Sequence, residues 1–239
     1  MSEVRSVAWK GDLFGQRIRE HCAEQLSRRL DVLVAGCAHD EPLELEHIET
    51  RSMGADEDHP VIRGVMEERA DLVSWSLGDL RSIPLKPRSY DVIQLSFLLE
   101  RIRHAELVLD RLLQALRPGG LVLLRMRDRG SAYGLLDRLT PSWLRRLLWR
   151  PLVGTERPGP LPTVYERLTS SDGMHAFCLS RGLLITDDVR NTSGPARNGR
   201  IGGAAVATIA KLTYGRYPAS HDEITMVIRK PQHHFARLL

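Results

Sequence analysis

Four small residues, Ala35-Gly36-Cys37-Ala38, stand directly after the apolar run Val32–Val34. Small side chains let a backbone bend and let a ligand approach it closely. An apolar strand, a small-residue turn and a helix together hold nucleotide-like ligands in α/β folds. Asp56 ends the short second strand predicted at 51–55, where an acidic residue binds ribose hydroxyls in such folds. A solvated acidic turn over Asp56–Asp58 explains the same residues equally well. The pattern predicts a nucleotide-like ligand beside these two segments.

The length and composition are those of a soluble globular protein of one domain. The 239 residues are 42% hydrophobic and 27% charged, which is ordinary for a globular protein of one domain. The sequence has no apolar run near the ~20 residues of a membrane span. It also shows no apolar N-terminal segment for secretion. We therefore expect a cytoplasmic protein.

Cysteine spacing and charge exclude two further classes of site. Cys22, Cys37 and Cys178 are odd in number and far apart, so we expect neither a disulfide framework nor a zinc site, and we assign no metal. The net charge is +4 and the pI is about 9.2, with arginine as the main basic residue. No basic motif with interleaved aromatics accompanies this charge, so we do not expect nucleic acid as a partner.

The elements that must position the small-residue turn alternate along the first half of the chain. An amphipathic helix is predicted over 12–30 from apolar residues that recur every four positions. Strands are predicted at 32–34, 51–55, 72–75, 90–95 and 121–126, with helices at 41–49, 61–69 and 106–116 and a stop at Arg117-Pro118-Gly119-Gly120. This alternation predicts parallel βαβ units, and hence a doubly wound, Rossmann-like α/β fold.

The second half changes character. Residues 137–150 are basic and contain two tryptophans, and a helix is predicted from Pro141. Four prolines then crowd 151–162, which indicates a loop or lid. Further elements are predicted as a helix at 170–180, a strand at 182–189, a glycine-rich loop at 194–203, a helix at 204–214 and a strand at 223–229. No separate second domain is indicated.

The stretch Gly78–Leu124 closely resembles class I S-adenosylmethionine-dependent methyltransferases of the type 11 group. The matching motifs are Gly78-Asp79, Ile83-Pro84, Tyr90-Asp91-Val92, Leu99-Glu100-Arg101 and Leu116-Arg117-Pro118-Gly119-Gly120. With the first loop included, the motifs stand in the family's order from Val32 to Leu124. The resemblance implies a seven-stranded sheet with a reversed hairpin at its edge and a helical lid insertion.

The resemblance also implies S-adenosylmethionine as cofactor and a role for each loop. The turn at Gly36, Cys37 and Ala38 would take the methionine and ribose, and Asp56 the ribose hydroxyls. Asp79 would accept from the adenine amino group while Leu80 packs on the ring, and Ser96 and Phe97 would line the sulfonium side. The implied division of the single domain 1–239 is an N-terminal helix (1–30), a cofactor-binding half (31–128), a lid and acceptor insertion (129–181), a terminal hairpin region (182–230) and a tail (231–239).

The first loop departs from the family pattern of an acidic residue and three alternating glycines. Only Gly36 is kept, Val34 replaces the acid, and Asp40 stands where the last glycine would be. Asp40 either faces the cofactor carboxylate, at a cost of roughly 4 kcal/mol for two charges ~4 Å apart, or caps the next helix. The family histidine after Leu99-Glu100 is Arg101. These departures leave open whether the cofactor is still bound, and how tightly.

Two functions remain open from the sequence. The first is methyl transfer to a small-molecule, sugar or lipid-like acceptor in biosynthesis, and the second is a methyltransferase-like protein that catalyses another step, such as a cyclisation, or acts as a binding partner. No catalytic residue is assigned, although His104, His175 and Tyr165 are candidate bases. Pro162–Tyr165 is expected near the acceptor mouth. Residues 137–150 could cover an acceptor or rest on a membrane surface, and the oligomeric state is left open.

Overall fold

The structure, a computed structural model, describes residues 12–24, 29–37, 45, 48–141, 143, 163–192 and 200–232. In the first half the elements are α1 (Leu13–Glu24), β1 (Leu30–Ala35), β2 (Thr50–Asp56), α2 (Pro60–Glu68), β3 (Ser74–Leu77), β4 (Tyr90–Ser96), α3 (Ala105–Ala115) and β5 (Leu116–Arg127). In the second half they are α4 (Ala132–Leu139), the 3₁₀ turn η2 (Arg167–Thr169), α6 (Ser171–Ser180), β6 (Leu184–Asn191), α8 (Arg200–Leu212) and β7 (Glu223–Arg229).

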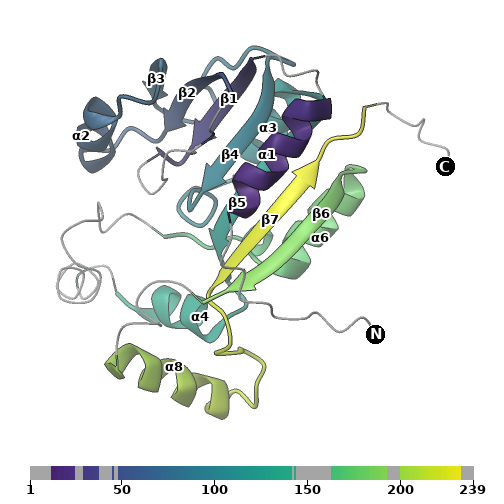
Figure 1. The fold of residues 1–239 in the computed structure, drawn as a ribbon. Coiled ribbons are helices and arrows are strands. Elements are labelled where there is room, and N and C mark those ends of the chain that lie inside the picture. The colour runs from purple at the N-terminus through teal and green to yellow at the C-terminus, as the bar shows by residue number, and fades with distance from the viewer. Residues whose placement is uncertain are drawn as a thin grey trace.

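The strands form one seven-stranded sheet in the order β3-β2-β1-β4-β5-β7-β6 (Figure 1). The first five strands are parallel, whereas β7 runs antiparallel to both β5 and β6. The doubly wound α/β fold with a reversed edge hairpin is thereby confirmed. The strand order reverses between β1 and β4, and ligands of such sheets bind outside the carboxyl ends of the strands at this point.

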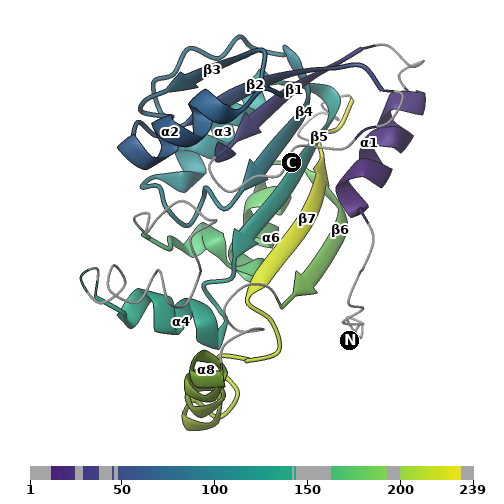
Figure 2. The ribbon, with the colours of Figure 1, turned by 60° about the vertical axis from the view of Figure 1, so that its left-hand side comes forward.

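Helices cover both faces of the sheet (Figures 1 and 2). On one face α1 and α2 pack on the strands through residues such as Ile18 and Met66. On the other face α3 and α6 pack through residues such as Leu112 and Phe177. The central strand β4 is buried along all seven of its residues because both of its faces are covered.

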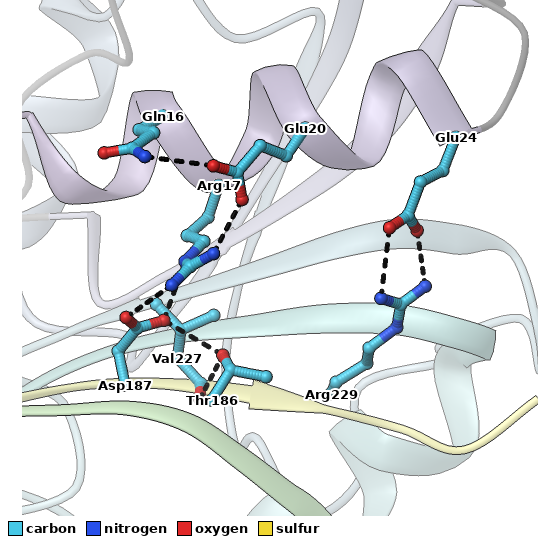
Figure 3. Close-up of polar contacts among 8 residues, drawn as sticks. All are labelled: Gln16, Arg17, Glu20, Glu24, Thr186, Asp187, Val227 and Arg229. Atoms are coloured by element: carbon cyan, nitrogen blue, oxygen red, sulfur yellow. Dashed lines mark hydrogen bonds and ion pairs between the residues drawn. The ribbon is translucent and has the colours of Figure 1, made fainter.

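Two ion pairs hold α1 across the antiparallel edge of the sheet (Figure 3). The Arg17 guanidinium donates to both carboxylate oxygens of Asp187 on β6, from Nε to Oδ2 at 2.8 Å and from Nη2 to Oδ1 at 2.7 Å. Arg229 on β7 donates to the Glu24 carboxylate near the other end of α1. The amphipathic helix predicted over 12–30 is present over 13–24. Its ion pairs connect the start of the described chain to β6 and β7 near its end.

Two predicted boundaries are wrong. The strand predicted at 121–126 begins at Leu116, because Leu116 already pairs with Tyr90 of β4. Gly120 lies inside this pairing, where a Cβ would come within 2.8 Å of the Asp91 carbonyl oxygen. The loop predicted at 194–203 is helical from Arg200, since α8 starts there and packs on α4 (Figure 1).

Two predicted helices fall on residues that the structure does not describe. The helix predicted at 41–49 has only 45, 48 and 49 among the described residues, and none of these is helical. The helix predicted from Pro141 runs into 144–150, outside the described residues. The helix α4, which precedes that segment, was not predicted at all.

Candidate functional site

A cavity of ≈ 750 Å³ opens beside the carboxyl ends of β2 and β3. Its volume lies within the range of about 300–1,000 Å³ typical of small-molecule sites. The lining residues are Glu57, Asp58, His59, Ile62, Gly78, Asp79, Leu80, Arg81, Arg101, Ile102, Arg103, His104, Val108, Thr163 and Val164. The cavity thus lies between the β2–α2 loop, the turn after β3 and the loop that leads into α3.

Asp79 and Leu80 lie on the cavity wall, in the turn after β3. The Leu80 side chain is buried, whereas Asp79 is exposed and accepts from Arg81 through its backbone N–H at 2.9 Å and its guanidinium Nη2 at 2.7 Å. These hydrogen bonds lower the pKa of Asp79 to about 2. Asp79 therefore stays ionised near neutral pH, and its acceptor capacity is shared with Arg81.

Asp56 is fully buried at the end of β2 and is ion-paired with Arg101. The Arg101 Nη2 atom donates to Asp56 Oδ1 at 3.1 Å and lies 3.4 Å from Oδ2. The Arg101 Nε atom donates to the Phe97 carbonyl oxygen at 2.7 Å. Since Arg101 follows β4 and Asp56 follows β2, this pair spans the carboxyl end of β1, where the strand order reverses.

Gly36 and Cys37 are packed against protein atoms. Gly36 has φ +85°, and a Cβ there would stand 2.4 Å from the carbonyl oxygen of Ser96. The glycine is therefore required by its conformation and by the close passage of β4. The Cys37 thiol is buried and donates to the Val34 carbonyl oxygen at 3.1 Å.

Ser96 and Phe97 lie at the carboxyl end of β4. The Ser96 side chain is buried, and Phe97 has φ +51°. Arg125 and Arg127 of β5 stand over the Phe97 ring, with guanidinium carbons 5.6 and 5.2 Å from its centroid. Ala38, His39 and Asp40 lie outside the described residues. Of the residues assigned to the cofactor from the sequence, the structure therefore brings Asp79 and Leu80 to the cavity wall.

A segment of four residues, 163–166, which we call the strap, closes one side of the cavity. Thr163 and Val164, which belong to the stretch 162–165 expected near an acceptor, line the cavity. Val164 N donates to the Glu100 carbonyl oxygen at 2.7 Å. The Glu166 carboxylate accepts from the backbone N–H groups of His104 and Ala105 at 2.6 and 3.0 Å. The strap therefore caps the N-terminus of α3 from a distant part of the sequence.

Replacing Glu166 by alanine is expected to lower the free energy of unfolding by about 1–2 kcal/mol, because α3 loses a charged acceptor at two N–H groups of its first turn. Urea unfolding measures this loss. Glu106→Ala is the matched control, since Glu106 is an exposed glutamate in the first turn of the same helix and pairs with Arg181. Equal losses in the two variants would show that the strap does not stabilise α3.

The three candidate bases lie in different surroundings. His104 is exposed on the cavity wall, whereas His175 lies on α6, with its Nδ1 atom 2.8 Å from the Ser171 carbonyl oxygen. Tyr165 is buried and donates to Asp137 Oδ2 at 2.8 Å. Burial raises the pKa of Tyr165 well above its ordinary value, which disfavours the phenolate that a base requires.

Sequence reasoning missed Glu100 as an ionisable group of interest. Its side chain is buried, its Oε1 atom accepts from Arg127 N at 3.3 Å, and burial raises its pKa to about 7. The flanking apolar residues Leu98 and Leu99 were the signal that this carboxyl group lies inside the protein. Glu100 is not among the residues that line the cavity. Its backbone carbonyl accepts from the N–H groups of Val164 and Tyr165 in the strap.

None of the helices in the described part of the chain has the length and the apolar composition that a membrane span requires. No group of three or more His, Cys, Asp and Glu side chains in the same residues is placed to hold a metal ion. Leu139 and Trp143 are exposed at the end of α4 and just beyond it, while 144–150 lie outside the described residues.

A family model described as a methyltransferase domain matches residues 31–124. The match covers β1 to β5, and it includes the turns that carry Gly36, Asp56 and Asp79. The resemblance to class I S-adenosylmethionine-dependent methyltransferases is thereby confirmed for this part of the chain. No protein of curated function matches the sequence.

Two solved structures share the fold over most of the chain. An S-adenosylmethionine-dependent methyltransferase from Mesorhizobium loti aligns with 90% of this chain and 96% of its own, at 15% identity and a TM-score of 0.51. Another from Archaeoglobus fulgidus aligns with 91% and 93%, at 14% identity and a TM-score of 0.50. At these identities the likeness concerns the fold.

Proposed function

We propose that the chain binds S-adenosylmethionine in the cavity and transfers its methyl group to a small-molecule, sugar or lipid-like acceptor in a biosynthetic reaction. The observation that carries this proposal is the cavity at the carboxyl ends of β2 and β3, inside the segment that matches the methyltransferase domain. In this proposal residues 31–128 hold the cofactor and residues 129–181 cover the acceptor.

The adenine end of the cofactor fits the residues present. Leu80 offers a buried apolar side chain and Asp79 an ionised carboxylate on the same turn, and the cavity is large enough for the ligand. The ribose end fits less directly, because the acid at the end of β2 is already paired with Arg101. The residues near Gly36 that would meet the methionine part include 38–44, outside the described residues.

The chemistry asks little of the protein beyond alignment. The sulfonium of the bound cofactor supplies an activated methyl group, so holding the acceptor in line provides most of the acceleration. Thr163 and Val164 of the strap would position the acceptor and exclude water. A hydroxyl acceptor also needs a general base, and His104 is the candidate that stands on the cavity wall.

The second function, a methyltransferase-like protein that does not methylate, is favoured by one observation. The Asp56–Arg101 pair removes the usual ribose acid from the cavity. Such a protein would use the same cavity for another biosynthetic step or for binding alone. The two functions differ in whether the cavity accepts the methyl donor or its demethylated product.

Isothermal titration of the purified protein with S-adenosylhomocysteine and S-adenosylmethionine tests the proposal. We expect saturable binding of both, and a loss of roughly five- to tenfold in affinity for Asp79→Ala, which removes one hydrogen-bond acceptor. Asp172→Asn, in an exposed acid of α6 that does not line the cavity, is the matched control and is expected to bind like the wild type. Absence of binding at millimolar ligand would overturn the proposal and favour the second function.

A further inference from the structure

The Asp56 carboxylate is engaged within the protein. Its Oδ1 atom accepts from Arg101 Nη2 and from Glu57 N, the latter at 2.8 Å, and the side chain has no exposed surface. A ribose hydroxyl would have to displace the guanidinium to reach it. Asp56 is also absent from the cavity wall, although the three residues that follow it line the cavity.

Arg101 is itself held in place. Its side chain is 4% exposed, and its Nε atom is fixed by the Phe97 carbonyl oxygen. Moving the guanidinium away would leave the buried Asp56 carboxylate without this counter-ion, which is strongly unfavourable in protein interiors. The ion pair is therefore a stable part of the protein beside the cavity. Arg101 lines the cavity, whereas Asp56 does not.

Glu57 is the carboxylate that this arrangement leaves for a ligand. Successive residues of an extended segment point to opposite sides, so Glu57 turns toward the cavity where Asp56 turns inward. No donor among the described residues contacts its carboxylate. Partial burial raises the pKa of Glu57, and the charges that act on it come from Arg101 and Asp56 and from Asp79 and Arg81. Glu57 thus stands between the proposed adenine turn and the ion pair.

We propose that Glu57, and not Asp56, accepts the hydrogen bonds of the ribose hydroxyls in this protein, while Arg101 neutralises Asp56. This inference rests on the proposed function, because it takes an adenosine-containing ligand as the occupant of the cavity. A vicinal diol offers two O–H donors and a carboxylate offers two acceptor oxygens, so one side chain satisfies both hydroxyls. Arg101, which replaces the family histidine, pairs with Asp56 and thereby leaves the ribose hydroxyls to Glu57.

The test compares two kinds of change in one calorimetric series. S-adenosylhomocysteine is titrated into the wild type and into Glu57→Gln, Glu67→Gln and Asp56→Asn. Adenosine and 2′,3′-dideoxyadenosine are then titrated into the wild type and Glu57→Gln. Glu67→Gln is the matched control, since Glu67 is an exposed glutamate of α2 that does not line the cavity.

For Glu57→Gln we expect S-adenosylhomocysteine to bind about tenfold more weakly, the effect of losing charged hydrogen bonds, while Glu67→Gln changes its affinity by less than about twofold. The preference of the wild type for adenosine over the dideoxy analogue is expected to shrink by the same factor in Glu57→Gln. That coupling is a readout that a merely structural role of Glu57 would not produce. Asp56→Asn is expected to lose stability, with its folded fraction still binding.

The outcomes distinguish a failure of the proposed function from a failure of the assignment of Glu57. If the wild type binds neither S-adenosylhomocysteine nor adenosine, the proposed function fails. If the wild type binds both and Glu57→Gln binds equally well, with its preference for the ribose hydroxyls intact, only the assignment of Glu57 fails. A selective loss of affinity in folded Asp56→Asn would return the role to Asp56. Should Asp56→Asn not fold, the comparison between the two nucleosides still decides.

Discussion

Replacing Asp56 by alanine is expected to lower the free energy of unfolding by about 3–5 kcal/mol, the range for breaking one partner out of a buried ion pair. The change leaves the Arg101 guanidinium buried without its counter-ion, and among the described residues its Nη1 atom has no hydrogen-bond partner. Denaturant unfolding followed by circular dichroism measures this loss. The size of the effect follows from burial, because the same pair at the surface would contribute little.

Two variants control for this prediction. Asp79→Ala removes an exposed acid that is also paired with an arginine, and its unfolding curve is expected to stay close to that of the wild type. The double variant Asp56→Ala/Arg101→Met removes both buried charges, so it is expected to be more stable than Asp56→Ala alone. A single variant as stable as Asp79→Ala would contradict the buried pair.

The sequence predicts the fold best where both faces of a strand are covered. Tyr90–Leu95 was predicted as a buried strand, with four apolar residues among its six, and the observed strand β4 extends it by one residue. The edge strand β3 was placed at 72–75 but spans Ser74–Leu77, because Leu72 packs in the core ahead of the strand and the strand itself is mostly exposed. The apolar character of Leu72 therefore predicts its burial correctly. It does not predict which residues of the edge strand β3 form hydrogen bonds with β2.

The site was predictable only in part, for a different physical reason. Asp79 and Leu80 are adjacent in one short turn, so their places on the cavity wall could be predicted from the local sequence. The pairing of Asp56 with Arg101 joins residues 45 positions apart. The arginine that replaces the family histidine indicates a changed site. Its partner could not be predicted, because it depends on which strand ends lie close together in the folded sheet.

The second large effect concerns the pH dependence of stability and belongs to Glu100. Burial raises its pKa from the ordinary 4.5 to about 7, against the opposing effects of Arg101 and Arg127. Between these pH values the unfolded chain releases the proton while the folded chain keeps it. Stability therefore falls as pH rises through this window, and the loss is complete above the folded-state pKa. At about 1.4 kcal/mol for each unit of difference, the loss amounts to about 3 kcal/mol.

Glu100→Gln isolates this effect, because glutamine keeps the shape and never ionises. The free energy of unfolding of Glu100→Gln, measured by urea titration from pH 4.5 to 8, is expected to rise relative to the wild type by about 3 kcal/mol across that range. Glu106→Gln, in an exposed glutamate of the neighbouring helix α3, is expected to show no such rise. A constant difference between wild type and Glu100→Gln at every pH would mean that Glu100 ionises normally. Because the Glu100 side chain is buried and does not line the cavity, a normal titration would mean that water reaches its carboxyl group inside the protein.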